Sequence, residues 1–433
     1  MPTTSSIPVT LPRVTRWRTM RQERGPMRSR SGLWAWVVVG AAGIISIMTA
    51  PGQTAGLSVL TEPLIEDLSI SRTEISISYL IGTLLGASMQ PFVGRSLDRW
   101  GARSVTIVIG AAFALILLAF SFVSEIVGLT AGFTGVRMAG QGALTLAATT
   151  AVARAVRHRR GLALGITGAV GSAGISLAPI GLERLIASVG IYDTWRWEAA
   201  LVAIVVIPLA FFFPRRPLSI DPSARVSTTQ IAIQKESWTL SEAIQSGMFW
   251  VISASVATAG MLTTALAFHQ IAILGRQGLD PLEAATNFLP QTITAILATV
   301  LAGSLIDRIN PKWLIVFSMT TLVGALLLLP LVSPGWSAIG YGLVLGAAGG
   351  SLRGMEAASY VRYFGLAHIG SIRGAATALG LASTAFGPLA LSVGSDLSGG
   401  FVVPAACLAI IPLAVIVWCL FVRQPARRTA SNI

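Results

Sequence analysis

The sequence predicts an all-α membrane protein whose twelve transmembrane helices form two pseudo-symmetric bundles of six. Three observations predict this fold class. Of the 433 residues, 53% are hydrophobic and 11% are charged, whereas soluble domains carry about 25% charged residues. The apolar residues gather in segments near the ~20 residues that a bilayer-spanning helix needs. A short charged motif also occurs once in each half of the chain, which indicates an internal repeat.

Helix is the expected form of every span, because the segments do not show the short-period alternation of a membrane β-strand. The first apolar segment is too long for a signal-peptide core, so we expect it to be a retained helix. The expected spans are 34–58, 75–94, 104–123, 127–150, 161–186, 197–213, 247–274, 284–305, 313–332, 336–361, 374–395 and 401–422.

The loop charges predict how the chain crosses the membrane. With the N-terminus in the cytoplasm, four of the 31 Lys and Arg residues fall outside and two fall within helices, so that 25 face the cytoplasm. Cytoplasmic loops of membrane proteins carry such an excess. We therefore expect a multi-pass protein of the inner (plasma) membrane with both termini cytoplasmic.

The chain is expected to divide into a basic tail (1–33), a first bundle (34–214), a linker (215–246), a second bundle (247–422) and a short tail (423–433). The linker is polar and contains proline, as interdomain linkers do. The stretch TLSEAI within it predicts a short surface helix capped at Thr239 or Ser241.

Several classes of protein are excluded by composition and motifs. The net charge of +13 comes from scattered basic residues, so nucleic acid is not expected as a partner. Cys407 and Cys419 share one apolar segment and cannot form a disulfide framework or a metal site. There is no Walker loop, metal-ligand spacing or catalytic triad, so neither an enzyme nor a cofactor is expected.

The repeated motif lies in the second-to-third loop of each half. It comprises Gly94, Asp98, Arg99, Gly101 and Arg103 in GRSLDRWGAR, and Gly303, Asp307 and Arg308 in GSLIDRINPK. It resembles the loop signature of the major facilitator superfamily of secondary transporters, and the similarity extends over nearly the whole chain. The stretches EPLIEDLSISRTEIS, RHRRGLALGITGAVGSAG and YFGLAHIGSIRG are similar to the monocarboxylate-porter branch, which includes oxalate/formate exchangers.

The resemblance implies a monomeric symporter or antiporter that moves a small molecule across the lipid bilayer by alternating access. Protons or a counter-transported anion would be the coupling partner. It also implies that Asp98 contacts the start of the eleventh span near Gly374, and Asp307 the start of the fifth near Gly161. These clasps would hold the halves together on the cytoplasmic side. The alternative is that both aspartates are solvated loop charges.

Charges within the spans are candidates for the substrate site, because a charge at membrane depth faces a cavity or a partner. Arg137 lies near the middle of the fourth span with Gln141 four residues later. In the pseudo-equivalent tenth span, Arg353 and Glu356 share a helix face. The arginines could anchor an anion; alternatively, Arg353 pairs with Glu356 and Arg137 is structural. Glu356 is also a candidate for coupling.

Neutral polar residues complete the candidate site. His269 is a candidate for substrate or proton binding, and Gln53, Asn287 and Gln291 are candidate hydrogen-bonding partners. The eighth span has Thr299 where carboxylate transporters of the resembling branch often carry arginine. The missing arginine argues against a simple monocarboxylate, whereas Arg137 and the family resemblance favour transport of a small organic anion. Export of drugs or amphipathic metabolites is the alternative. A transporter-like sensor would need a sizeable cytoplasmic domain, which these short loops do not supply.

Overall fold

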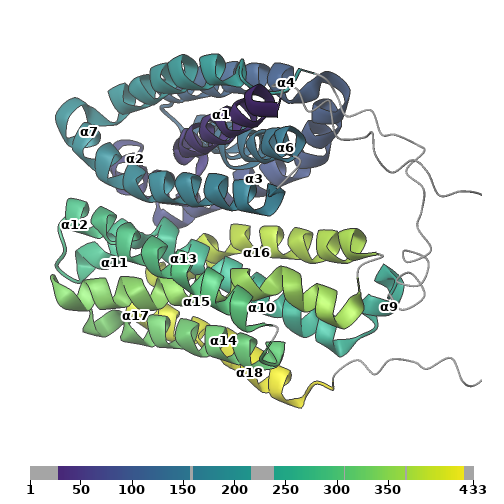
Figure 1. Ribbon diagram of the computed structural model, residues 1–433. Coiled ribbons are helices and arrows are strands. Elements are labelled where there is room, and N and C mark those ends of the chain that lie inside the picture. The colour runs from purple at the N-terminus through teal and green to yellow at the C-terminus, as the bar shows by residue number, and fades with distance from the viewer. Residues whose placement is uncertain (1–27, 157–158, 216–237, 307, 366–367, 424–433) are drawn as a thin grey trace, which may run out of the picture.

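The computed structural model describes residues 28–156, 159–215, 238–306, 308–365 and 368–423, which form helices joined by short turns (Figure 1). Within those ranges no strand occurs. Seven helices there are long and apolar enough to cross a membrane. The prediction of an all-α membrane protein is confirmed, and the helices group into an N-terminal and a C-terminal half (Figure 1).

The first pass of the chain is a broken helix. It consists of α1 (Arg28–Ile47), the 3-10 turn η1 (Ala50–Gly52) and α2 (Thr54–Asp67). Pro51 has no N–H to donate and Gly52 has low helix propensity, so the helical ladder is interrupted at this dipeptide. The break leaves backbone groups near the middle of the membrane, where neighbouring side chains can bond them.

Two long helices of the N-terminal half each contain a reversal of the chain. The helices α4 (Gln90–Phe120) and α7 (Arg160–Ala210) have 31 and 51 residues. The 51 residues would span about 77 Å at 1.5 Å per residue. Gly101 in α4 and Gly190 in α7 have φ of +81° and +82°, which is unstrained only for glycine. The chain turns at both glycines, so that each helix contributes to two passes.

The remaining helices of this half include an irregular segment. The helix α3 (Arg72–Ser88) starts at a capping box made by Ser71 and Glu74. The fourth pass comprises α5 (Ile126–Val136), the π-helix η2 (Arg137–Leu144) and α6 (Thr145–Ala155). Since π-helical turns often lie at functional sites, the position of Arg137 at the start of η2 makes it a candidate functional residue.

The C-terminal half begins with α9 (Leu240–Ile244), which is capped by Thr239 as the sequence predicted. Four of its six passes consist of two successive helical segments. The passes are α10 (Gly247–Phe268) with α11 (Gln270–Arg276), α12 (Pro281–Thr286) with α13 (Phe288–Leu305), α14 (Pro311–Leu328) with η3 (Leu329–Leu331), α15 (Trp336–Phe364), α16 (Ile369–Ser398), and α17 (Val402–Leu408) with α18 (Ile410–Phe421).

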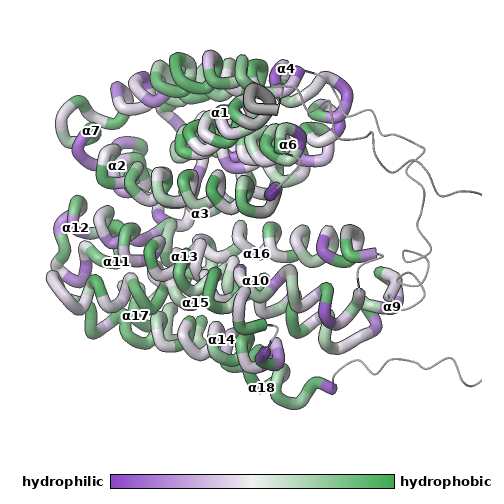
Figure 2. Tube along the Cα trace, in the orientation of Figure 1, coloured by the Kyte–Doolittle hydropathy of each residue, from purple (hydrophilic) through white to green (hydrophobic). Residues whose placement is uncertain are grey.

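When each broken or turning helix is assigned to its passes, the described residues cross the molecule six times in each half. Hydrophobic residues follow the lengths of the helices, and hydrophilic residues collect toward their ends (Figure 2). The halves meet where α2, α3 and α7 of the first contact α10, α11, α12, α13 and α16 of the second.

Candidate functional site

A cavity of about 720 Å³ lies between the two halves. Its N-terminal wall comes from the start of α2 and from α7, and its C-terminal wall from α10, α13, α15 and α16. The polar and charged residues of its lining include Gln53, Thr54, Thr264, Gln291, Arg353, Glu356, Arg373 and Thr377. A volume of this size is typical of pockets that enclose a small molecule.

The halves touch at one end of the cavity, which we call the closed end. The hydroxyl of Thr73 at the start of α3 donates to a carboxylate oxygen of Asp396 near the end of α16. The rings of Tyr79 and Phe268 lie 4.4 Å apart between their centroids, and the Arg72 guanidinium lies 5.3 Å from the Phe401 ring centroid. These contacts join the halves on the side opposite the ends of the described chain.

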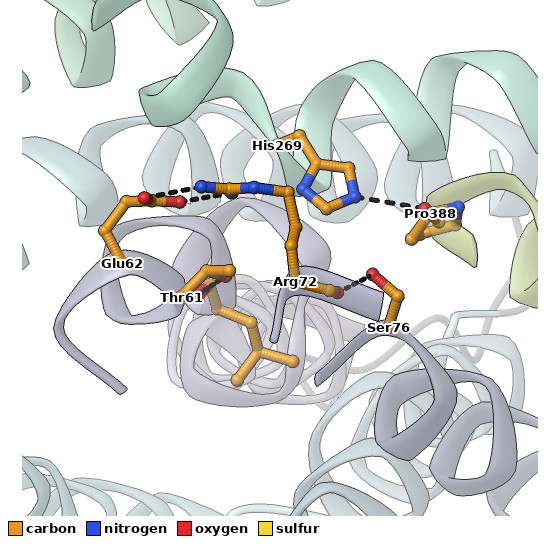
Figure 3. A network of polar contacts seen from close by, with 7 residues as sticks. Thr61, Glu62, Arg72, Ser76, His269 and Pro388 are labelled. Atoms are coloured by element: carbon orange, nitrogen blue, oxygen red, sulfur yellow. Dashed lines mark hydrogen bonds and ion pairs between the residues drawn. The ribbon is translucent and has the colours of Figure 1, made fainter. Parts of the chain in front are cut away.

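A polar network supports the closed end (Figure 3). Arg72 makes two hydrogen bonds to Glu62 of α2, at 2.5 and 2.7 Å. His269, at the junction of α10 and α11, contacts the carbonyl oxygen of Pro388 through Nε2 at 3.0 Å. It is 1% exposed and does not line the cavity. Its Nδ1 is buried and finds no hydrogen-bond partner among the described residues.

The other end of the cavity, which we call the open end, carries the charged wall. Arg353 on α15 and Arg373 on α16 are exposed, and Glu356 is half-buried. Arg353 donates from Nε to the carbonyl oxygen of Gly349 in its own helix, at 3.2 Å. The ion pairs of the described residues do not include an Arg353–Glu356 pair, so the ion-paired arrangement considered from the sequence is not formed.

The orientation of α15 follows from close packing on its opposite face. A Cβ added to Gly346, Gly350 or Gly354 would lie 2.1–2.2 Å from a backbone carbonyl oxygen of α13. Residues four apart share a helix face, so these glycines form one stripe against α13. Arg353 and Glu356 lie off that stripe and face the cavity.

A chain of amides extends from the cavity into the C-terminal half. Gln291 lines the cavity and donates to the side-chain oxygens of Gln270 and Asn287, at 2.8 and 3.0 Å. Asn287 is buried and donates to the carbonyl oxygen of Ala338. Asn287 therefore contacts the cavity only through Gln291, which it helps to orient.

Arg137 lies behind the N-terminal wall of the cavity and is 2% exposed. It donates to Thr83 at 3.1 Å, to the carbonyl oxygen of Gly52 at 3.2 Å and to Thr54 at 3.3 Å. Its guanidinium carbon lies 4.6 Å from the Tyr79 ring centroid. Within the described part of the chain, Nη2 has no hydrogen-bond partner and no carboxylate pairs with the cation.

Arg137 thus satisfies the carbonyl oxygen that is freed at the break in the first pass. The break lies directly beside Gln53 and Thr54 of the cavity wall. Gln53 follows Gly52, whose carbonyl oxygen is freed by the helix break, and it faces the cavity. Its side-chain amide donates to the hydroxyl of Thr49 at 3.1 Å. Gln141 is half-buried against Gly52 and is not part of the cavity lining.

The loop motif does not join the halves in this conformation. Asp98 is 80% exposed and pairs with Arg154 of α6 in its own half, at 2.8 Å. Its expected partner position, Gly374, has open space around it. Asp307 lies outside the described residues. Of its neighbours in the second motif, Gly303 packs near Gly354, and Arg308 follows the end of α13.

Arg373 was not singled out from the sequence as a site residue. The expected eleventh span began at 374, which placed Arg373 among the loop charges, whereas α16 begins at Ile369. A basic residue one turn inside a long apolar helix was the available signal. Glu198 of α7 is 7% exposed and is not part of the cavity lining.

The fold and the cavity can be compared with known proteins. The family model described as Major Facilitator Superfamily matches residues 42–388. No curated protein matches the sequence. A bacterial homolog of the human lysosomal transporter Spinster, inward-facing and unoccupied, is 15% identical with a TM-score of 0.68, over 89% of this chain and 95% of that one.

Two further solved structures are similar at comparable levels. The Spinster homolog in an inward-facing, occupied conformation is 15% identical with a TM-score of 0.67, over 93% of this chain and 100% of that one. A mutant of the nucleoside transporter NupG is 14% identical with a TM-score of 0.68, over 88% and 98%. At these identities the likeness shows the fold alone. Because the family model covers most of the sequence, this chain belongs to the major facilitator superfamily.

Proposed function

We propose that the protein is a secondary transporter that moves a small organic anion by alternating access. The observation that carries this proposal is the charged wall of the cavity, where Arg353 and Arg373 accompany a single carboxylate, Glu356. The excess positive charge would attract an anion, and a guanidinium fork matches the two oxygens of a carboxylate. The resemblance of several loop stretches to the monocarboxylate-porter branch supports the same substrate class.

The neutral wall would hold the rest of the substrate. Gln53 and Thr54 face the cavity from the first half, and Gln291 and Thr377 from the second. Hydroxyl and amide groups both donate and accept hydrogen bonds, so a hydroxylated or otherwise polar acid fits this lining better than a purely apolar one. Coupling would involve a proton or a counter-transported anion, with Glu356 as the candidate proton carrier.

The conformation described here corresponds to one state of the cycle in this proposal. The cavity is closed where Thr73 meets Asp396 and opens toward the side of the chain ends. The excess of basic residues in the loops on that side supports a cytoplasmic location, which would make the state inward-facing. The loop clasp of Asp98 would then form in the outward-facing state.

Uptake of labelled short organic acids into proteoliposomes, with and without a pH gradient, tests the substrate class. We expect Arg353→Gln and Arg373→Gln to raise the half-saturation concentration ten- to a hundredfold, as for a lost charge-assisted hydrogen bond of about 1.5–3 kcal/mol. The half-saturation concentration of Arg353→Lys should lie between those of the wild type and Arg353→Gln, because lysine keeps the charge but lacks the planar guanidinium fork. The control is Arg184→Gln, an exposed arginine outside the cavity. Equal uptake in all variants would reject the anion site.

The second candidate function is export of drugs or amphipathic metabolites. It is favoured by the lining, which is neutral except for Arg353, Glu356 and Arg373. The same vesicles distinguish the two functions: transport of amphipathic cations that is lost in Glu356→Gln and kept in Arg373→Gln supports export. Uptake of organic acids that is lost in Arg373→Gln, without transport of amphipathic cations, supports organic-anion transport.

A further inference from the structure

A second cavity opens on the outer surface of the N-terminal half, away from the other half. It has a volume of about 400 Å³ and lies between the two passes of α4 and the π-helix η2. We call it the lateral cavity. It shares no lining residue with the cavity between the halves. Its apolar lining is formed by Met89, Phe92, Val93, Trp100, Val108 and Met138.

The lateral cavity faces the space that lipid would fill. Phe92, Trp100 and Val108 are 57%, 56% and 67% exposed, and such exposure of large apolar side chains marks a binding surface or lipid contact. Ser96 and Ser104 are the polar residues of the lining. The cavity therefore offers a hydrocarbon-compatible groove with little hydrogen-bonding capacity.

The depth of the lateral cavity matches one leaflet of a bilayer. It extends along α4 from Met89 to Trp100, next to the turn at Gly101. Eleven residues of helix rise about 16 Å, which is half of the ~30 Å hydrocarbon core. An acyl chain that enters from the leaflet at the Gly101 turn would fill this length.

Cationic side chains surround the mouth of the lateral cavity. Arg95 and Arg99 lie four residues apart, and neither belongs to an ion pair of the described residues, whereas Arg103 lies over the ring of Phe211, which follows α7, 4.3 Å from its centroid. Arg95 and Arg99 lie over the rings of Phe92 and Trp100, 5.3 and 5.7 Å from the ring centroids. These two rings line the cavity, so the positive charge is held where the groove reaches the membrane surface.

We propose that the lateral cavity binds one acyl chain of an anionic phospholipid whose headgroup phosphate contacts Arg95 and Arg99. Basic clusters at the ends of transmembrane helices attract anionic lipids by about 1 kcal/mol per residue. The corresponding turn of the second half offers a different environment. There Lys312 donates to the carbonyl oxygen of Val422, so its ammonium group is directed toward the protein.

Fluorescence quenching by brominated lipid tests the proposal, because Trp100 lines the lateral cavity. The protein is placed in phosphatidylcholine vesicles containing either brominated phosphatidylglycerol or brominated phosphatidylcholine. The difference between the wild type and Trp100→Phe isolates the signal of Trp100. We expect the relative binding constant to favour phosphatidylglycerol, and the double variant Arg95→Gln/Arg99→Gln to lower it roughly thirtyfold, which corresponds to about 2 kcal/mol.

Two controls separate the headgroup contacts from the groove. Arg184→Gln, an exposed arginine elsewhere, should keep the preference for the anionic lipid. Val108→Phe should reduce quenching by filling the groove, whereas Ile204→Phe, which is 72% exposed outside it, should not. Melting curves of each variant verify that it is folded.

Equal quenching by both brominated lipids in the wild type would overturn the proposal. Survival of the preference in the double arginine variant would also overturn it. Native mass spectrometry provides an independent measurement: a protein dimer that carries no bound phosphatidylglycerol would show that a second copy of the chain covers the groove instead.

Discussion

Each half carries an arginine in its fourth pass, and the tertiary structure places the two residues in different environments. Arg137 is 2% exposed and donates to neutral oxygens of the first and second passes. Arg353 faces the cavity and donates only to Gly349 of its own helix among the described residues. The environment of a membrane-embedded charge therefore depends on the neighbouring helices, since the two spans are equivalent in the repeat.

The difference has a local physical cause. In the first half, the break at Pro51-Gly52 frees a carbonyl oxygen beside η2, and Arg137 satisfies it. In the second half, α10 continues without interruption from Gly247 to Phe268, so its carbonyl oxygens are used within the helix. Arg353 therefore has no freed backbone acceptor opposite it and extends into the cavity.

The largest effect should come from breaking the close helix contacts that set up each arrangement. An added Cβ would lie 2.2 Å from the Val136 oxygen in Gly52→Ala and 2.2 Å from the Ala295 oxygen in Gly350→Ala. Because backbone must move, we expect losses of unfolding free energy at or above the upper end of the usual ~1–3 kcal/mol for overpacking. Thermal melting in detergent measures them.

Matched controls lie on the same helices. Gly40 of α1 and Gly340 of α15 have open space around them, so Gly40→Ala and Gly340→Ala should raise stability by up to about 1 kcal/mol. Similar melting temperatures for Gly350→Ala and Gly340→Ala would mean that the α13–α15 contact does not orient α15.

The second prediction is that substitution of Arg137 lowers stability, whereas substitution of Arg353 lowers substrate affinity. Arg137→Gln should lower the free energy of unfolding by about 1.5–3 kcal/mol, because a charged donor to Gly52 is lost. Arg353→Gln should leave melting nearly unchanged and weaken substrate binding. Melting and uptake measured on both variants test the contrast. Loss of affinity without loss of stability in Arg137→Gln would assign the anion anchor to the first half.

The third prediction concerns the closed end of the cavity. Thr73→Val removes the hydrogen bond to Asp396 that joins the halves, and we expect the closed end to open more often, by about 0.5–1.5 kcal/mol. Thr73→Ser keeps the hydroxyl and is the control. The readout is labelling, by a reagent applied at the closed end, of a cysteine introduced at Thr264, which lines the cavity. Identical labelling rates in both variants would contradict a role for this bond.

The smallest effect is expected at the open end. Asp98→Asn removes an exposed ion pair with Arg154, which is worth less than about 1 kcal/mol. If Asp98 also clasps the helix start near Gly374 in the other state, the variant should favour the open-ended state by up to about fivefold, or 1 kcal/mol. Labelling of Thr377→Cys from the open end measures this shift. Asp193→Asn removes an exposed pair with Arg196 at the opposite end and should have no effect.

Part of the candidate site could be predicted from residue type and position in the span. Gln53, Gln291, Arg353 and Glu356 line the cavity, and each is a polar residue within an apolar segment. Arg137, Gln141, His269 and Asn287 satisfy the same description and lie behind the wall or at the closed end. Both groups have the same sequence pattern, because a polar residue in a membrane helix can face a cavity or a neighbouring helix equally well.

By itself, the sequence determined the membrane fold, the helical passes and the repeat of two halves. These features depend on apolar length, loop charge and an internal motif, which are local properties of the chain. Only the tertiary structure decided that Arg373 belongs to the cavity, that Asp98 pairs within its own half, and which arginine is buried. The physical reason is that these outcomes depend on the packing of helices far apart in sequence. A close contact at a glycine, or a carbonyl oxygen freed by a helix break, determines where each charged side chain points.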